Sequence, residues 1–201
     1  YAARIIPYRG SWLDYEFDAK DLIYSRIDRK RKFPATAILK SLDMTDEEIL
    51  SSFYESMPVV YENEKFFLNI TKENLKGKAF DFPIKIGTMS IVAGKRINAK
   101  IIQDFEKLKS PKIEIEKEDF IGQVFAKDIV NKETGEIFAT TNSQIDKTVL
   151  KNLSETKKLE FEIIYTNSID SGPFVADTLR NDPSKSKAEA LVDIYRMLRP
   201  G

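Results

Sequence analysis

The amino-acid sequence predicts an α+β fold, in which a small domain of mixed helices and strands is interrupted by an inserted α+β domain. Near the N-terminus, a strand of alternating apolar and acidic residues precedes two helical segments. A middle block then alternates short strands with short helices around single glycines, and a capped helix follows it. We expect residues 1–54 and 172–201 to form one discontinuous domain, and residues 55–171 to form the inserted domain.

Composition excludes several kinds of chemistry. The 201 residues are 42% hydrophobic, which is enough for a buried core, and they include no Cys and no His. The absence of Cys excludes disulfides and thiolate metal sites and fits a cytosolic protein. The absence of His removes the commonest general base and metal ligand. The 32 basic and 32 acidic residues balance, so any contact with nucleic acid must come from a local cluster of charge.

The sequence carries no targeting or membrane signal. No apolar run approaches the ~20 residues that span a bilayer, so we expect a cytoplasmic location and no membrane partner. Tyr1 is not an initiator Met, and the chain ends at Pro200-Gly201 directly after a helical pattern. We therefore expect a piece of a larger protein.

The first elements predict a hairpin followed by a helix. Residues 13–18 alternate apolar and acidic side chains, which indicates a strand with one buried face. A turn at 19–20 leads to a return strand over 22–28. Pro34 then favours the start of a short helix over 35–42.

Two capping boxes mark further helices. Thr45 with Glu48, and Ser186 with Glu189, have the spacing in which a hydroxyl and a carboxylate satisfy orphan amides reciprocally. The first helix places Ile49, Leu50 and Phe53 on one face. The second stops before Pro200, and we expect it to be buried through Leu191, Val192, Ile194, Tyr195 and Leu198.

The middle block contains a hairpin signal and an internal repeat. Residues 132–135 (K-E-T-G) separate two strand-like stretches and predict a turn. Helix starts at Asn98 and Asp146 lie 48 residues apart, and apolar positions match at the same offset. A strand of alternating charge follows each helix, at 112–115 and 158–162. Either two ordinary capped helices match by chance, or the block is a tandem helix-plus-strand module.

Two acidic clusters suggest catalysis or metal binding, but both have simpler explanations. Asp14, Glu16 and Asp18 share one face of a strand, as on the solvated side of an amphipathic strand. The sequence 46–48 (D-E-E) lies in a first helical turn, where negative charge complements the helix dipole. No phosphate loop of the G-x-x-x-x-G-K type is present. We expect no catalytic residue, metal or cofactor in this chain.

The strongest polar signal is the run of residues 26–32, in which five of seven residues are basic and only Asp28 is acidic. Such a run either contacts phosphates without reading sequence or forms a solvated loop. Aromatic residues flank it, and sites for single strands combine basic grooves with stacking aromatics. Gly10 and Ser11 place Trp12, the only tryptophan, at a turn, so Trp12 is the aromatic residue that we expect to be exposed.

Four sequence strings are long and distinctive: I-I-P-Y-R-G-S-W-L-D-Y-E-F-D, R-I-D-R-K-R-K, D-T-L-R-N-D-P and L-V-D-I-Y-R-M-L-R-P-G. They resemble the β subunit of bacterial DNA-directed RNA polymerase. All lie in the two outer segments, which resemble the lobe domain, one jaw of the DNA-binding cleft. Through G-Q-V-F-A-K-D and E-T-G-E, the middle block is similar to a lineage-specific insertion found in the lobe of many proteobacterial enzymes.

The resemblance implies roles for individual residues. Trp12 would stack on a base of the non-template strand near the transcription start, and Asp28 would help to shape the same pocket. Arg199 would lie near the non-template strand upstream. Arg29 and Arg31 of the basic run are further DNA-binding candidates. The catalytic magnesium of the polymerase would be held in the other large subunit, outside this chain.

The resemblance also implies partners: the non-template strand and downstream duplex of DNA, the other polymerase subunits and sigma factor, and regulators on the insertion. Two functions stay open. An exposed Trp12 beside the basic run favours a DNA-contacting domain of a transcription enzyme. An exposed apolar patch on the insertion would favour a protein-interaction module that docks transcription regulators. The lack of His, Cys and a phosphate loop argues against an independent enzyme.

Overall fold

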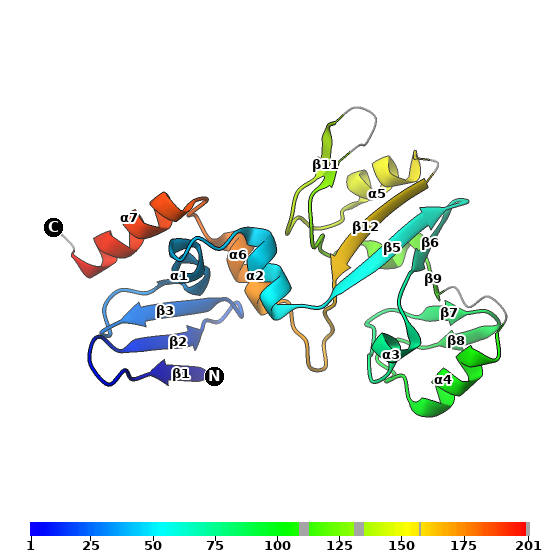
Figure 1. Cartoon of the computed structure of the whole chain (residues 1–201), viewed down its shortest axis with the longest axis horizontal. Helices are drawn as coiled ribbons and strands as arrows, with labels where there is room; N and C mark the ends of the chain where they lie inside the picture. The colour runs from blue at the N-terminus through cyan, green and yellow to red at the C-terminus, as the bar shows by residue number, and fades with distance from the viewer. Residues whose placement is uncertain (109–112, 131–134, 157, 200–201) are drawn as a thin grey trace. The chain divides into compact units, whose positions relative to one another are not determined.

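The protein divides into two compact units (Figure 1). This computed structural model describes residues 1–108, 113–130, 135–156 and 158–199. Unit 1 comprises Tyr1–Phe53 and Pro173–Gly201, and unit 2 comprises Tyr54–Gly172. Both units combine helices with antiparallel strands, so the predicted α+β class is confirmed.

A four-stranded antiparallel sheet of order β1-β2-β3-β4 forms one layer of unit 1. Its strands are β1 (Ala2–Ile5), β2 (Leu13–Phe17), β3 (Ile23–Ile27) and β4 (Phe33–Pro34). The predicted hairpin is confirmed as β2–β3. The carboxylate of Asp18 closes its turn by accepting the backbone N–H groups of Lys20 at 2.8 Å and Leu22 at 3.0 Å.

The expectation of one buried face on the first hairpin strand is wrong. Phe17 is exposed, and the other four residues of β2 are all half-buried. The acidic side is partly covered because Asp14 pairs with Arg4 and Glu16 pairs with Arg26. The alternation alone predicts that the two faces of β2 differ in exposure, and the ion pairs reduce this difference.

Four helices complete unit 1: α1 (Ala35–Ser41), α2 (Asp46–Phe53), α6 (Phe174–Asn181) and α7 (Lys187–Leu198). The first capping box is confirmed, with Glu48 N–H to Thr45 Oγ1 at 3.2 Å and Thr45 N–H to Glu48 Oε2 at 2.7 Å. In the second, Ser186 Oγ accepts from Glu189 N–H at 3.3 Å. The Glu189 carboxylate reaches the N–H of Lys185 instead, at 2.6 Å. The sequence analysis missed α6.

The last helix is not the buried helix that we expected. Leu191, Val192 and Tyr195 of α7 are exposed. The stripe that packs against Phe33 and α1 consists of Ala190, Ile194 and Met197. The apolar residues of α7 are distributed over several of its sides, but only the side that carries this stripe packs against α1. Phe53 of α2 is likewise exposed, although Ile49 and Leu50 are buried. Pro200, expected to stop α7, lies outside the described residues.

A buried polar cluster joins the two segments of unit 1. The side chains of Lys40 and Asp182 are 4% and 0% exposed, and Lys40 Nζ lies 3.6 Å from Asp182 Oδ2. Thr36 Oγ1 donates to the same carboxylate at 2.6 Å, and Lys40 Nζ donates to the carbonyl of Ser184 at 2.5 Å. Removing one partner of such a pair leaves the other charge buried without compensation.

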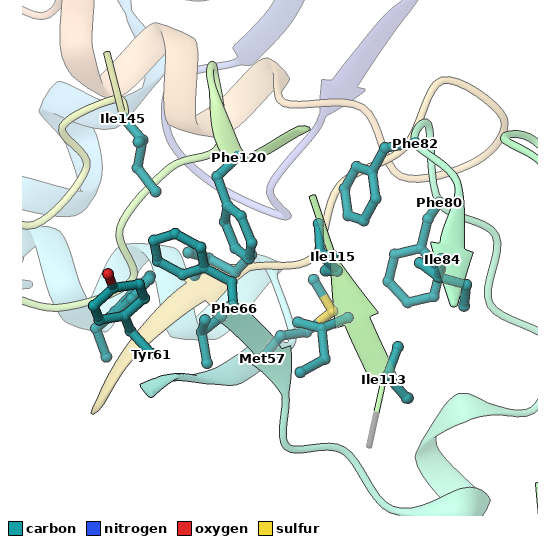
Figure 2. Close-up of a cluster of buried hydrophobic side chains, with 14 of the residues drawn as sticks. Met57, Tyr61, Phe66, Phe80, Phe82, Ile84, Ile113, Ile115, Phe120 and Ile145 are labelled. Atoms are coloured by element: carbon teal, nitrogen blue, oxygen red, sulfur yellow. The ribbon is translucent and has the colours of Figure 1, made fainter. Parts of the chain in front are cut away.

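Unit 2 is built on a six-stranded antiparallel sheet of order β12-β5-β6-β9-β7-β8. Its strands are β5 (Ser56–Glu62), β6 (Lys65–Leu68), β7 (Ile84–Ile86), β8 (Met89–Ile91), β9 (Ile113–Ile115) and β12 (Lys158–Ile164). Figure 2 shows the apolar core on this sheet. The Phe66 ring lies 4.7 Å from the rings of both Tyr61 and Phe120, between centroids.

The tandem module is confirmed. Helices α4 (Ala99–Glu106) and α5 (Lys147–Ser154) occupy equivalent positions 48 residues apart. The carboxamide of Asn98 accepts the N–H of Ile101 at 3.0 Å, and the carboxylate of Asp146 accepts the N–H of Val149 at 2.8 Å. The following strands are β9 and β12; Lys112, expected to start the first of them, lies outside the described residues.

The repeat is larger than the sequence analysis found. Gly77 N–H donates to Ile97 O at 2.9 Å, and Gly122 N–H donates to Ile145 O at 2.8 Å. Each glycine follows a short helix, α3 (Lys72–Leu75) or the 3₁₀ helix η1 (Lys117–Phe120). The predicted hairpin is confirmed as β10 (Ile129–Val130) with β11 (Ile137–Ala139). Residues 132–134 of its turn lie outside the described residues.

We expect Asp182→Ala to lower the free energy of unfolding of unit 1 by about 3–5 kcal/mol, because it removes the buried carboxylate beside Lys40 and leaves that buried ammonium with the half-exposed carboxylate of Asp46, at 3.9 Å. Urea denaturation followed by the fluorescence of Trp12, the only tryptophan, reports unit 1. The matched control is Lys187→Ala, which removes the exposed ion pair with Asp43 at 3.5 Å and is expected to cost less than about 1 kcal/mol. Equal losses in both variants would contradict the prediction.

Candidate nucleic-acid interface

Two loops meet at one end of the unit 1 sheet. One connects β1 to β2 over residues 6–12, and the other connects β3 to β4 over residues 28–32. In Figure 1 both leave the strands at the left-hand end of the sheet. The N–H of Asp28 donates to the carbonyl of Trp12 at 2.9 Å, which continues the β2–β3 ladder by one pair. The structure thus places Trp12 beside the basic run that the sequence analysis singled out.

The Asp28 carboxylate holds the Trp12 loop. One oxygen accepts the Ser11 hydroxyl at 2.6 Å, and the other accepts the backbone N–H of Trp12 at 2.8 Å. These bonds, the Ser11 bond first, lower the pKa of Asp28, and the nearby charge of Lys30 lowers it further. Asp28 therefore stays ionised and positions Trp12 through its backbone.

The backbone at this junction is strained. Asp28 and Arg29 have φ values of 51° and 57°, in the left-handed region that L-residues other than Asn and Asp seldom adopt. Such a conformation costs on the order of 1–3 kcal/mol for a residue such as Arg29 and less for Asp28. The hydrogen bonds of Asp28 offset this cost. Strain of this kind clusters at binding sites, where it fixes the direction of a side chain.

Two guanidinium groups lie over the Trp12 ring. The Cζ atom of Arg4 is 5.0 Å from the ring centroid, and that of Arg29 is 5.4 Å away. Both distances are within cation–π range, and the Trp12 residue remains 38% exposed. The expectation of an exposed Trp12 is confirmed. Sequence reasoning missed Arg4; the signal was the pairing of β1 with the acidic strand, which sets Arg4 opposite Asp14.

Arg4 is fixed by a carboxylate. Its Nε pairs with one Asp14 oxygen, and its second Nη donates to the other oxygen at 3.3 Å. The hydrogen bond from Arg4 is the largest cause of a lowered pKa at Asp14, and the charges of Arg4, Arg29 and Arg26 add to it. Conversely, the bond to Asp14 raises the pKa of Arg4. The charge of Arg4 is thus largely compensated.

The remaining predicted residues lie around this centre. Arg199 follows α7, and its guanidinium lies 6.0 Å from the Tyr195 ring centroid. The carbonyl of Leu198 accepts Lys30 Nζ at 3.0 Å, which brings the end of α7 to the basic run. Arg31 is exposed. Of the basic residues in this run, Arg26 is the one that forms an ion pair among those described, with Glu16 at 3.0 Å.

The suspected carboxylate set is engaged elsewhere. Asp14 and Glu16 bind arginines, and Asp18 closes a turn. Across residues 1–108, 113–130, 135–156 and 158–199, no group of three or more acidic side chains is arranged to hold a metal ion. Within the same ranges, every helix is too short or too polar to cross a membrane.

A family model described as RNA polymerase Rpb2, domain 2, matches residues 1–117. The chain belongs to this family. It is therefore a segment of the second-largest subunit of DNA-directed RNA polymerase, a nucleotidyltransferase complex, and the other polymerase subunits are its partners. The match contains Trp12, Asp28, Arg29 and Arg31, and it continues past Phe53 into the first copy of the repeat in unit 2. Arg199 lies beyond the matched range.

We expect the Asp28 contacts to be lost at low pH. Because these contacts lower the pKa of Asp28 in the folded chain, their stabilisation is present above the ordinary aspartate value of 3.8 and is lost as the pH falls through the folded pKa below it. Ser11→Ala removes the largest cause, so the midpoint should move upward toward 3.8. Trp12 fluorescence measures the midpoint. Asp14→Asn is the control that separates the titration of Asp14, and an unmoved midpoint in Ser11→Ala contradicts the prediction.

Proposed function

We propose that this chain is the lobe region of a bacterial RNA polymerase β subunit, that it forms one side of the DNA cleft, and that it binds the unpaired non-template strand. The observation that carries the proposal is Trp12 at an exposed loop junction, with Arg4 and Arg29 over its ring and Asp28 holding its backbone. An aromatic ring surrounded by cations is the arrangement that binds single strands.

The free energies of the two contacts favour replacement of a guanidinium by a base on the Trp12 ring. Stacking of a base on an aromatic side chain contributes about 1–3 kcal/mol. One exposed cation–π contact contributes about 0.5–1 kcal/mol. A base can therefore replace one arginine on the Trp12 ring. Arg29, Lys30 and Arg31 would then contact phosphates, and Arg199 would contact the strand upstream.

The proposal extends to the whole chain. Unit 1 is the lobe, and unit 2 is its lineage-specific insertion. The downstream duplex and sigma factor are further partners. The chain supplies no catalytic residue and no cofactor, and the polymerase holds its magnesium elsewhere. It acts in the cytoplasm on nucleoid DNA. Binding by the chain alone rests on few phosphates, so it should weaken quickly as salt rises.

The test is the lifetime of the open complex formed by polymerase reconstituted with Trp12→Ala, on promoters that differ only in the non-template base near the start site. We expect the base preference to fall about tenfold, as the loss of one stacking contact implies, while elongation persists. Tyr8→Ala is the matched control, because Tyr8 is an exposed aromatic residue of the same loop. A base preference that survives Trp12→Ala rejects the proposal.

A second function is favoured by the β10–β11 ribbon of unit 2. Ile137 is 57% exposed, and Val130 and Phe138 are exposed beside it. The two strands form a sheet of their own. Open strand edges carrying apolar side chains are surfaces on which other proteins pack. We propose that this ribbon docks transcription regulators.

Ile137→Asp tests the second function. We expect transcription by purified polymerase to remain within about twofold of the wild type, because the surface change leaves the core intact. The response of the same polymerase to regulators should fall in cells, as measured by transcript profiles. Ile169→Asp, at an exposed apolar position of unit 2 outside the ribbon, is the control. Identical profiles for the two variants contradict docking at the ribbon.

A further inference from the structure

The two arginines over Trp12 are held in different ways. Arg4 lies on β1 and Arg29 follows β3, the strands on either side of β2. Arg4 is fixed by two contacts to Asp14, whose side chain is largely buried. Among the interactions of the described residues, the close contact of the Arg29 guanidinium is the Trp12 ring itself. One cation is therefore anchored by hydrogen bonds, whereas the other rests on the aromatic surface and interacts with Asp14 through charge alone.

We propose that the two arginines act differently when a base stacks on Trp12: Arg4 is a fixed support of the ring, and Arg29 is a displaceable ligand of it. When a base stacks on Trp12, Arg29 leaves the ring and binds the adjoining phosphate. This inference rests on the proposed function and assigns a distinct role to each arginine.

Charge determines which arginine moves. The charge of Arg4 is compensated by Asp14, so moving Arg4 onto a phosphate would leave that carboxylate without its partner. Arg29 makes no described hydrogen bond or ion pair with Asp14 and interacts with it only through charge. A guanidinium binds phosphate through paired, charge-assisted hydrogen bonds that an aromatic ring cannot offer. A bound phosphate is therefore the better partner for Arg29.

The backbone allows Arg29 to move without moving Trp12. Asp28 fixes Trp12 through its carboxylate and through its own N–H, so the backbone of Trp12 stays attached to the β2–β3 ladder. Arg29 lies in the loop that leaves this ladder, it has a left-handed φ of 57°, and its guanidinium lies over the ring. Rotation of the Arg29 side chain alone can end its contact with the ring, while Arg4 stays in place.

The experiment uses the 201-residue chain, whose single tryptophan is the sensor. It is titrated at low salt with a thymidine decamer and with a decamer of the same length that lacks all bases. Trp12 fluorescence reports stacking, and the anisotropy of a dye on each decamer reports affinity. We expect the wild type to prefer the thymidine decamer and to show quenching with that decamer only.

The two arginines should then behave differently. Arg29→Ala should weaken binding of both decamers and reduce the salt slope by about one, while thymidine still quenches Trp12. Arg4→Ala should leave the salt slope unchanged and reduce the preference for thymidine over the abasic decamer roughly tenfold. Arg29→Lys should restore the salt slope. Arg4→Lys should not restore the preference, because an ammonium lacks the planar fork that Asp14 and the indole contact.

Equal changes in salt slope for Arg4→Ala and Arg29→Ala overturn the inference, as does an unchanged thymidine preference in Arg4→Ala. Neither result touches the proposed function as long as the wild type shows base-dependent quenching. If the wild type shows no such quenching and Trp12→Ala binds both decamers as the wild type does, the proposed function fails together with the inference. Circular dichroism of each variant separates loss of folding from loss of a contact.

Discussion

The buried contact between Lys40 and Asp182 is the interaction on which unit 1 depends. It joins α1 to the segment that follows α6, two parts of the chain separated by all of unit 2. That connection directs α7 along α1, and the end of α7 then reaches the basic run, where Leu198 accepts Lys30. The segment that this salt bridge holds thus leads, through α7, to the residues beside the candidate site.

Unit 2 lowers the loop-closure entropy that this connection costs, because unit 2 brings its own two ends together. β5 and β12, its first and last strands, pair in antiparallel register from Ser56 with Ile164 to Glu62 with Lys158. The N–H of Tyr165 donates to Glu55 O at 2.8 Å, and the Tyr54 hydroxyl donates to Gly172 O at 3.3 Å. Once unit 2 has folded, the loop that unit 1 must close is effectively a short one. A large inserted unit is therefore compatible with a small discontinuous domain.

Features that depend on residues close together in the chain could be predicted from the sequence. Features that depend on how strands align with one another could not. The Thr45 capping box and the paired caps at Asn98 and Asp146 could be read directly, because a cap depends on residues within one turn. Arg4 could not, since its place over Trp12 depends on how β1 aligns with β2. The full repeat was hidden because its offset changes from 45 residues at the glycines to 48 at the helices.

The two carboxylates at the candidate site show how acidic residues can be part of a surface that we propose binds an anion. Asp14 and Asp28 both have lowered pKa values because each accepts hydrogen bonds from the groups that build the site. Their charges are directed into the protein, toward Arg4 and toward the Ser11–Trp12 backbone. None of the described ion pairs includes Arg29, Lys30 or Arg31: Arg29 lies over the Trp12 ring, Lys30 donates to the Leu198 carbonyl, and Arg31 is exposed. The balanced composition of the chain therefore conceals a local imbalance: its carboxylates position the tryptophan, and its loop cations remain available to phosphate.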